Sequence, residues 1–471
     1  MNILDQLRNA IGDAFVLTKA ADTAKWAHDW TGNYSSTPIA VLRPKDTREV
    51  AAIMAIAYAT QTPVVPVSGN TGLNGGASAN DDALLLSLDR LDQISQINPE
   101  GRTATVGAGV ILANLHNAVK AFGLIFPLTF GARGSAMIGG VLSTNAGGSN
   151  VLRYGNTRDH VMGLEVVMAD GAIMNLMGAL HKDNSGLNLK HLMIGAEGTL
   201  GIITAAVLKL SPEPRAYATA MVATLDLSAA LALLNAVQSA TGDAVEAFEF
   251  MPRAYIDGHL ALDPRAKPPF KESYDVNILI EVGATAARDA TPDPDGSVPV
   301  VRLLEDILTQ LFEAGLVLDA VVAQNDTQRA AMWARREAAA EIAFAKHPFI
   351  DTDIAVALHD VAVFLDRMTL RLADLDAAAS ELSVAHLGDG NIHYTAYPSR
   401  DDPALTDAIK CAVEDVVQDL NGSFSAEHGV GLSKLNAMRR RKDPVALANM
   451  KAIKAALDPK GILNPGKMYP D

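Results

Sequence analysis

Cysteine, long apolar runs and positive charge are all scarce in this chain of 471 residues. The single cysteine, Cys411, excludes an intramolecular disulfide and a cysteine-based metal cluster, which fits a reducing cytoplasm. No apolar stretch is long enough to span a bilayer, and residues 1–7 lack the apolar core of a signal peptide, so we expect a cytoplasmic protein that is not an integral membrane protein. Asp and Glu outnumber Lys and Arg by 54 to 39, and the net charge of −15 argues against nucleic acid and anionic membranes as main partners.

The length and the pattern of the chain predict more than one domain. A chain of 471 residues is too long for one ordinary hydrophobic core. Up to Pro214 the sequence is rich in glycine and in short β-prone runs, with helical segments between some of them, which indicates a mixed α+β domain. After it, two strand–helix–strand sets at residues 218–250 and 276–323 predict an antiparallel sheet with helices on one face, ferredoxin-like in style.

Periodicity and turn residues give the individual elements. We expect strands at residues 64–67, 83–87, 103–107, 164–168, 200–209, 218–224, 244–250, 276–282 and 317–323. We expect helices at residues 47–60, 112–122, 228–239, 301–314, 326–344, 361–377, 403–420 and 444–457.

Two histidines flank a strong turn signal, Gly388-Asp-Gly-Asn391. Strands at 384–387 and 392–396 around a turn centred between Asp389 and Gly390 would pair His386 with His393, with Cβ atoms roughly 5 Å apart. That spacing suits two imidazoles on one divalent metal, and Glu427 would complete a site of two histidines and one carboxylate with open positions. His428, the next residue, would be the base that removes a proton.

The alternative is a surface hairpin with two unrelated histidines. The symmetric placement about the turn, the Glu427-His428 dipeptide and the glycines at 429 and 431 favour the metal site. Zinc fits the ligand set best, although manganese, ferrous iron and cobalt accept the same nitrogen and oxygen ligands.

Glycine is concentrated in three places, residues 66–76, 131–148 and 195–202. Glycine and small polar residues leave backbone N–H groups available to cradle an anion. The sequence has neither a Gly-Lys-Ser/Thr phosphate loop nor a Gly-x-Gly-x-x-Gly motif that opens a helix, so neither common nucleotide fingerprint applies. The first loop alone is as well explained by a plain turn, but the three clusters together suit a long ligand lying along exposed backbone, which is the shape of a dinucleotide.

These segments resemble one flavoprotein superfamily. Residues 66–72, 139–148 and 195–201 look like the FAD-binding segments of the vanillyl-alcohol oxidase type. Residues 386–393 and Glu427-His428-Gly, together with Leu463-Asn464-Pro-Gly-Lys467, resemble its D-2-hydroxyacid dehydrogenase branch, which includes D-lactate, D-2-hydroxyglutarate and glycolate dehydrogenases.

The resemblance implies an α+β fold with three parts. Residues 1–214 would form a two-subdomain FAD-binding module, residues 215–421 a ferredoxin-like antiparallel-sheet cap for the substrate, and residues 422–471 a segment that returns to the FAD module. The residues that would contact FAD are Pro66, Ser68, Gly69, Asn70, Thr71, Gly72, Leu73, Pro127, Gly131, Ser135, Gly139, Gly140, Ser143, Asn145, Gly148, Ile203 and Asn464. Some relatives attach FAD covalently through His or Cys, but the matching loop here reads Gly69-Asn70-Thr71, so we expect non-covalent FAD.

The resemblance also implies a reaction. A 2-hydroxy acid would chelate the metal, His428 would take the hydroxyl proton, and hydride would leave for flavin N5. In Trp333-Ala-Arg335-Arg336-Glu337, Arg336 matches the arginine that binds the substrate carboxylate. The alternative is that Arg335 and Arg336 are helix-surface charges paired with Glu337 or Glu341, and at least one of them must be, because neighbours on a helix point roughly 100° apart.

One departure bears on the substrate. Hydroxyglutarate enzymes of the family often carry Lys-x-Asp where this chain has Asp351-Thr-Asp353. An anion there disfavours a second carboxylate, unless Lys346 or Arg253 supplies the cation, so a monocarboxylic acid such as D-lactate stays open. An electron-transfer flavoprotein, a quinone, a dye-like carrier and oxygen all stay open as electron acceptors, and a homodimer is the expected assembly.

Two other classes of function compete with this one. The first is a metallohydrolase that uses His386, His393 and Glu427 to activate water, with the glycine clusters as scaffold. The second is a non-catalytic nucleotide-binding protein that has kept the fold.

Overall fold

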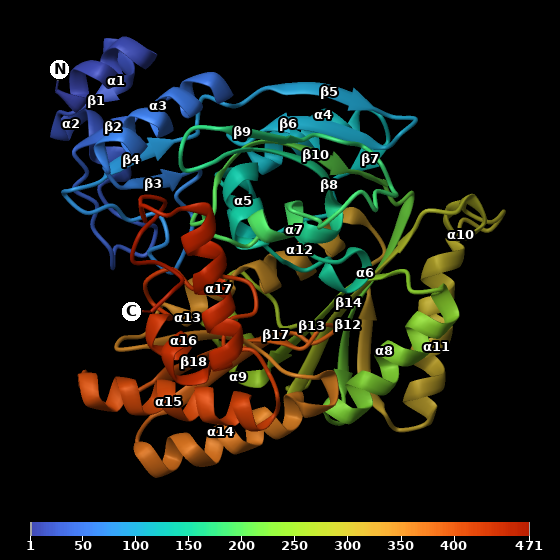
Figure 1. The fold of residues 1–471 in the computed structure, drawn as a ribbon. Helices are drawn as coiled ribbons and strands as arrows, with labels where there is room; N and C mark the ends of the chain where they lie inside the picture. Colours follow the sequence, from blue (N-terminus) through green and yellow to red (C-terminus); the bar gives the residue numbers. More distant parts are fainter. Residues whose placement is uncertain (1, 471) are drawn as a thin grey trace. The chain divides into compact units, whose positions relative to one another are not determined.

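The computed structural model describes residues 2–470, and the chain divides into two compact units (Figure 1). The first comprises the residues up to Gly147, Asn156–Pro212 and the segment from Glu427 onward. The second comprises Gly148–Gly155 and Glu213–Ala426. Within residues 2–470, no helix is both long enough and apolar enough to cross a membrane.

The first unit contains two main sheets. The four-stranded sheet has the order β1 (Val16–Leu17), β2 (Ala40–Leu42), β4 (Leu84–Ser87), β3 (Val64–Val67), and its last three strands are parallel. The five-stranded antiparallel sheet has the order β5 (Ile94–Asn98), β6 (Thr103–Gly107), β10 (Ile202–Lys209), β8 (Val161–Val167), β9 (Ile173–Leu176). A short pair, β7 (Leu124–Ile125) and β11 (Ser211–Pro212), completes its strands.

The helices of the first unit are α1 (Ile3–Ile11), α2 (Ala20–Thr23), α3 (Thr47–Thr60), α4 (Leu112–Lys120), α5 (Ile138–Thr144), α7 (Lys190–Met193), α16 (Leu435–Arg441) and α17 (Pro444–Leu457). Several of them, including α3, α4 and α5, share apolar cores with these sheets. Helix α3 shows why: Asp46 caps its first turn by accepting from Glu49 N, and Val50, Ile53 and Ala57 recur at helical spacing and are fully buried.

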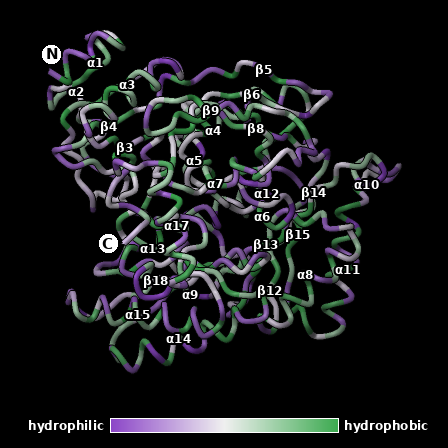
Figure 2. The backbone as a smooth tube through the Cα atoms, in the orientation of Figure 1, coloured by the Kyte–Doolittle hydropathy of each residue, from purple (hydrophilic) through white to green (hydrophobic). Residues whose placement is uncertain are grey.

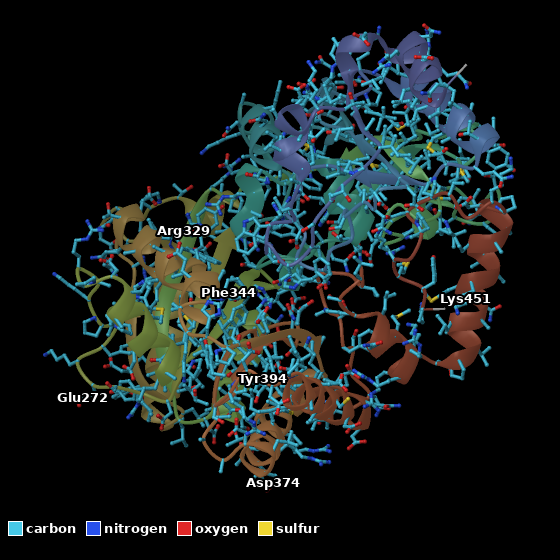
Figure 3. The ribbon with its side chains drawn as sticks, turned by 90° about the vertical axis from the view of Figure 1, so that its left-hand side faces the viewer. Glu272, Arg329, Phe344, Asp374, Tyr394 and Lys451 are labelled. Carbon is cyan, nitrogen blue, oxygen red and sulfur yellow. The ribbon has the colours of Figure 1, made fainter. Side chains whose placement is uncertain are left out.

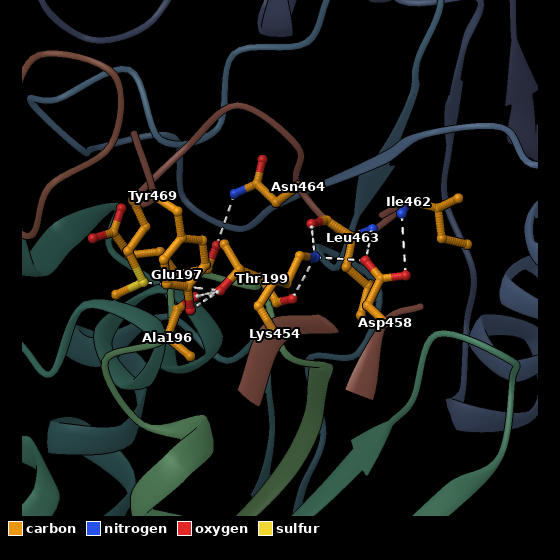
Figure 4. A network of polar contacts seen from close by, with 10 residues as sticks. Ala196, Glu197, Thr199, Lys454, Asp458, Ile462, Leu463, Asn464 and Tyr469 are labelled. Atoms are coloured by element: carbon orange, nitrogen blue, oxygen red, sulfur yellow. Dashed lines mark hydrogen bonds and ion pairs between the residues drawn. The ribbon is translucent and has the colours of Figure 1, made fainter. Parts of the chain in front are cut away.

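The C-terminal segment completes the four-stranded sheet. Val64 N donates to Ile462 O and Asn464 N donates to Val64 O, so residues 462–464 lie beside β3. Lys454 of α17 donates to the carbonyls of Thr199 and Leu463 and pairs with Asp458 at 2.5 Å (Figure 4). Residues 427–470 therefore belong to the same unit as the N-terminal sheets, and residues 462 and 463 are buried in its core.

The second unit is built on one seven-stranded antiparallel sheet. Its order is β15 (Val317–Val322), β12 (Ala216–Thr224), β14 (Val276–Ala284), β13 (Val245–Pro252), β17 (Ser380–His386), β18 (Asn391–Tyr397), β16 (Ile350–Ala355). Its first four strands come from the two predicted strand–helix–strand sets, so the expected α+β fold with an antiparallel sheet in the second half is confirmed.

Helices cover both faces of this sheet. On one face α8 (Leu227–Thr241), α11 (Pro299–Glu313), α14 (Val361–Leu375) and α15 (Pro403–Asp419) share a large apolar core with the strands. In Figure 2 these helices alternate between hydrophobic and hydrophilic residues, as helices do when only one side is buried. On the other face lie α9 (Arg253–Leu262), α12 (Asp326–Glu337) and α13 (Ala339–Ala343), and the short α6 (Val151–Tyr154) and α10 (Ala287–Ala290) belong to the same unit.

Polar side chains fix α12 and the hairpin strands to the sheet. Arg329 of α12 donates twice to Glu281 of β14, at 2.6 Å each, and its guanidinium lies over the ring of Tyr217 (Figure 3). Tyr394 of β18, also labelled in Figure 3, donates to Glu381 of the neighbouring strand at 2.6 Å. These bonds hold the elements that carry the candidate site.

Candidate active site

The histidine hairpin exists, but its register differs from the prediction. His386 pairs with Asn391 and Val384 pairs with His393, so the predicted pairing of His386 with His393 is wrong. The loop holds four residues, 387–390, and the N–H groups of Asp389 and Gly390 both donate to His386 O. A shift of two residues preserves the face of each side chain, so the imidazoles still meet, with ring centroids 5.5 Å apart.

A glutamate from another strand orients the first histidine. Glu249 of β13 lies 2.8 Å from His386 Nδ1 through its Oε1 atom. A carboxylate on one ring nitrogen fixes the tautomer and directs the other nitrogen toward a ligand, which is the usual outer-shell partner of a metal-binding histidine. Asp389, in the turn itself, accepts from Asn391 N and holds the turn.

Glu249 also binds the predicted carboxylate-binding arginine. Arg336 Nε donates to Glu249 Oε2 at 2.7 Å, and Arg336 Nη2 lies 3.4 Å from His386 Nε2. Burial would raise the pKa of Glu249, but His386 and Arg336 outweigh it and hold the pKa below its usual value. The result is a buried, ionised carboxylate between an imidazole and a guanidinium.

The two adjacent arginines are both buried. Arg335 is 8% exposed and Arg336 is 7% exposed, so the expectation that one of them is a surface charge is wrong. Tyr255 accounts for a break in the helix at this point, because its hydroxyl donates to the carbonyls of both arginines. A continuous helix would use those carbonyls itself, and the helix expected at 326–344 accordingly breaks at Ala338 into α12 and α13.

The segment Asp351-Thr-Asp353, which differs from the Lys-x-Asp of hydroxyglutarate enzymes, is anionic, and both of its carboxylates accept hydrogen bonds from the chain. Asp351 accepts from Thr395 at 3.0 Å, and the neighbouring Asp353, 1% exposed, accepts from Asn391 Nδ2 at 2.9 Å. The two alternative cations have other partners, since exposed Lys346 donates to Ser380 and exposed Arg253 pairs with Asp275.

In the first unit, the glycine-rich loops approach each other closely. A Cβ on Gly69 would lie 2.3 Å from Ser135 O, and a Cβ on Gly139 would lie 3.0 Å from Ser68 Oγ. The loop after β3 therefore packs on the start of α5 only because these positions are glycine. Asn145 ends α5 with φ +52°, and its side chain accepts from Arg158 N at 2.8 Å.

The other predicted cofactor residues fall on the same few elements. Pro66 lies in β3, residues 68–73 follow it, Pro127 and Gly131 follow β7, Ser135 precedes α5, Gly139, Gly140 and Ser143 lie in α5, Ile203 lies in β10, and Gly148 begins the second unit.

Asn464 joins two of these loops in the C-terminal segment. Its Nδ2 donates to Gly76 O at 3.0 Å. The same Nδ2 donates to Glu197 O at 2.7 Å (Figure 4). Its Oδ1 is buried and has no hydrogen-bond partner among residues 2–470. The amide therefore offers an acceptor to a molecule other than the chain.

Glu427 and His428 belong to the first unit, where two side chains hold the backbone that follows them. Asn74 Nδ2 donates to the carbonyls of His428 and Gly429, at 2.8 Å each. Glu197 accepts from Val430 N at 2.7 Å and from Gly431 N at 2.8 Å. The glycines around residue 197 were identified from the sequence, but the role of the Glu197 carboxylate was not. Glu249 was also missed, although a carboxylate inside the apolar strand at residues 244–250 indicated a functional group.

The chain matches two known protein families. Residues 38–177 match the FAD binding domain family, and residues 213–468 match the FAD linked oxidases, C-terminal domain family. Among curated relatives, D-2-hydroxyglutarate dehydrogenase of Xanthomonas citri pv. viticola is 35% identical over 468 residues, which cover 98% of this chain and 96% of the relative. The mitochondrial D-2-hydroxyglutarate dehydrogenase of Bos taurus is 35% identical over 94% of this chain and 79% of the relative.

Solved structures support the fold. A p-cresol methylhydroxylase with substrate bound matches with a TM-score of 0.74 over 100% of this chain and 96% of that one, at 16% identity. An alkyldihydroxyacetonephosphate synthase matches with a TM-score of 0.72 over 98% and 84%, at 15% identity. At such identities the likeness concerns the fold alone.

The family matches and the full-length relatives decide between the predicted classes of function. They favour a flavin-dependent oxidoreductase over a flavin-free metallohydrolase and over a non-catalytic nucleotide-binding protein. The chain belongs to the FAD-linked D-2-hydroxyacid dehydrogenases.

Proposed function

We propose that this enzyme oxidises a D-2-hydroxy acid to the 2-oxo acid, with D-2-hydroxyglutarate as its first candidate substrate. The observation that carries the proposal is the full-length similarity to enzymes named for that substrate, at 35% identity over 98% of the chain. We also propose that residues 1–214 bind FAD, that residues 215–421 supply the substrate side, and that residues 422–471 return to the FAD module.

The first unit fits a non-covalent FAD. Gly69 and Gly139 allow the loop after β3 to approach α5. Glycine-rich loops of this kind can present backbone N–H groups to a pyrophosphate. The buried Oδ1 of Asn464 supplies an acceptor that the chain itself does not use. FAD, when bound, accepts the hydride from the substrate α-carbon, while the protein supplies orientation and charge.

We further propose that His386, His393 and Glu427 bind a divalent metal, with zinc as the best fit. Glu249 fixes His386 through Nδ1, which directs Nε2 toward the metal. Ala426 N donates to Asp353 O, and Asp353 is the strand partner of His393. Glu427 follows Ala426 directly in the chain, and consecutive Cα atoms lie about 3.8 Å apart. The covalent link to Ala426 therefore supports Glu427 as the third ligand of the proposed metal site.

The remaining residues act on the substrate. A divalent metal, when bound, lowers the pKa of a coordinated hydroxyl. His428 removes that proton. Arg336 has five N–H donors, and because its Nε binds Glu249, we propose that its Nη groups bind the substrate carboxylate.

The experiment is anaerobic reduction of the bound flavin, followed by its absorbance. D-2-hydroxyglutarate should bleach the flavin and L-2-hydroxyglutarate should not. Absorbance that persists with every D-2-hydroxy acid in the presence of Zn²⁺ would contradict the proposal.

A second candidate substrate is a monocarboxylic acid such as D-lactate. The anionic Asp351, with Lys346 and Arg253 bonded elsewhere, favours it. Faster bleaching by D-lactate than by D-2-hydroxyglutarate at equal concentration would select this candidate. The electron-transfer flavoprotein or quinone acceptor, the homodimer and the cytoplasmic location stay predictions.

A further inference from the structure

Three glycine-containing loops of the first unit meet at one short segment, residues 427–431. From the second cluster, Gly147 lies against Glu427, since a Cβ there would be 2.5 Å from Glu427 Oε1. From the first, Asn74 donates to the carbonyls of His428 and Gly429. From the third, Glu197 accepts from the next two N–H groups, those of Val430 and Gly431. The loops predicted to cradle a cofactor therefore also hold the Glu427-His428 dipeptide.

Of the contacts that Gly147, Asn74 and Glu197 make with residues 427–431, that of Glu197 is the strongest. It is 9% exposed, and each of its carboxylate oxygens accepts one backbone N–H. Burial raises the pKa of Glu197, and the N–H groups of Val430 and Gly431 oppose that rise. Because each oxygen accepts one of two consecutive N–H groups, the Glu197 side chain fixes two successive peptide units.

The segment is shaped to receive that carboxylate. Gly429 and Gly431 have φ values of +71° and +52°, which side chains other than glycine rarely adopt. A Cβ on Gly429 would lie 2.7 Å from Glu197 Oε1, and a Cβ on Gly431 would lie 2.2 Å from Asn74 O. Both glycines are therefore required by the contacts with Glu197 and Asn74.

We propose that Glu197 is a positioning residue that acts through Val430 and Gly431 to fix Glu427 for metal binding and His428 for proton removal. Asn74 holds the same segment from the carbonyl side. The inference rests on the proposed metal and base roles of Glu427 and His428. It adds a requirement that lies outside the reacting groups: the metal site depends on a buried carboxylate that touches neither metal nor substrate.

The test is Glu197→Gln, prepared as the FAD-loaded full-length protein. The amide keeps the shape of the side chain but has one acceptor oxygen, so one N–H bond is lost and an NH₂ group faces the other donor. We expect Zn²⁺ to bind at least tenfold more weakly, measured by competition with a chromophoric chelator. FAD content should stay within twofold of wild type, and anaerobic flavin reduction should slow. Glu197→Asp keeps two acceptor oxygens and should fall between wild type and Glu197→Gln.

Asp458→Asn is the matched control. Asp458 is 2% exposed and accepts from the N–H groups of Ile462 and Leu463, at 3.1 and 2.7 Å, in the same unit (Figure 4). The substitution makes the same chemical change on a different segment. We expect it to lower thermal stability and to leave Zn²⁺ affinity within twofold of wild type.

Several results would overturn the inference. Zn²⁺ affinity of Glu197→Gln within twofold of wild type would do so, and so would an equal loss in Asp458→Asn. If Glu197→Gln does not fold, Asn74→Ala removes the two donors on the other side of the segment and carries the same expectation. If the wild-type protein binds no Zn²⁺, the proposed metal site is wrong. If wild type and Glu197→Gln bind Zn²⁺ equally well, only the role of Glu197 is wrong.

Discussion

The buried carboxylate at position 249 gives the sharpest single prediction. Glu249 is fully buried and accepts from Arg336 Nε at 2.7 Å and from His386 Nδ1 at 2.8 Å. Glu249→Gln removes the charge but keeps the shape. Arg336, 7% exposed, then loses its anionic partner, and His386 loses the group that fixes its tautomer.

Two magnitudes follow from this geometry. Removing one partner of a buried ion pair costs about 3–5 kcal/mol. Glutamine keeps one acceptor oxygen, so we expect the lower end, about 3 kcal/mol of unfolding free energy. Loss of the outer-shell partner of a metal-binding histidine lowers metal affinity by about 10–100-fold. The variant should therefore lose both stability and Zn²⁺ binding.

The assay pairs chemical denaturation with Zn²⁺ titration, and Glu246→Gln is its control. Glu246 is 3% exposed in the same strand and accepts from Arg153 at 2.8 Å and from Tyr154 at 2.6 Å. Its loss should also destabilise the protein, but it should leave Zn²⁺ affinity unchanged. The double variant Glu249→Gln/Arg336→Met should regain much of the stability lost in the single variant, because no charge is left buried alone.

Either of two results would contradict the proposed roles of Glu249. A stability loss below about 0.5 kcal/mol together with Zn²⁺ affinity within twofold would show that Glu249 does not hold Arg336 and His386 as described. An equal loss of Zn²⁺ in Glu246→Gln would show that the effect on metal is indirect.

Four further predictions come from individual side chains. His386→Ala should lose Zn²⁺ and turnover while keeping FAD; full activity after metal removal would exclude the metal role. His428→Ala should keep Zn²⁺ but slow anaerobic flavin reduction by about 10²-fold or more, and unchanged reduction kinetics would exclude its role as base. Arg335→Met should leave the unfolding free energy unchanged or raise it by about 1–2 kcal/mol, because the buried Nε has no hydrogen-bond partner among residues 2–470; a loss above about 1 kcal/mol in urea denaturation would contradict this. Burial lowers the pKa of Lys467 from 10.5 to about 8, only partly offset by Asp82, so between these values the unfolded chain binds more protons and wild-type stability should rise with pH by up to about 3 kcal/mol. Lys467→Met should abolish that rise in denaturation measured from pH 8 to 10, and an unchanged slope would refute the assignment.

Amphipathic patterns made the elements predictable. The expected helices at 47–60 and 444–457 match α3 and α17 to the residue, because caps and periodicity are local properties of the sequence. The expected helix at 326–344 is interrupted because Tyr255, some 80 positions away in sequence, takes two of its carbonyls. Local patterns contain no information about such a contact.

The histidine hairpin also depends on tertiary contacts that the local sequence does not contain. Gly388 to Asn391 is a strong short-turn signal, yet the loop is longer because Leu387 is fully buried in the core. A Cβ on Gly390 would lie 2.1 Å from the carbonyl oxygen of Val356, the residue that follows β16, so the loop is also packed closely against that segment. The sequence could show that both histidines share a face, because a register shift of two preserves it, but not their pairing.

Glu249 lies 137 residues from His386, and Glu197 lies 233 residues from Val430. Partners at such separations are set by the tertiary fold, so a single sequence gives residue types for the site but not the residues that orient them. The metal and base candidates came from a local motif, whereas the side chains that hold them did not.

The bonds of β3 to the end of the chain have a consequence for biosynthesis. Val64 bonds to Ile462 and Asn464, so β3 leaves the ribosome long before this partner segment is made, although its other neighbour, β4, follows soon after it. Most of the second unit, Glu213–Ala426, is translated in between, and at about 5–20 residues per second this stretch alone takes roughly 10–40 s. During that time the core of the nascent first unit lacks Ile462 and Leu463, which are 1% and 0% exposed in the folded unit, so chaperone binding to stalled nascent chains should fall sharply once residues 462–464 emerge.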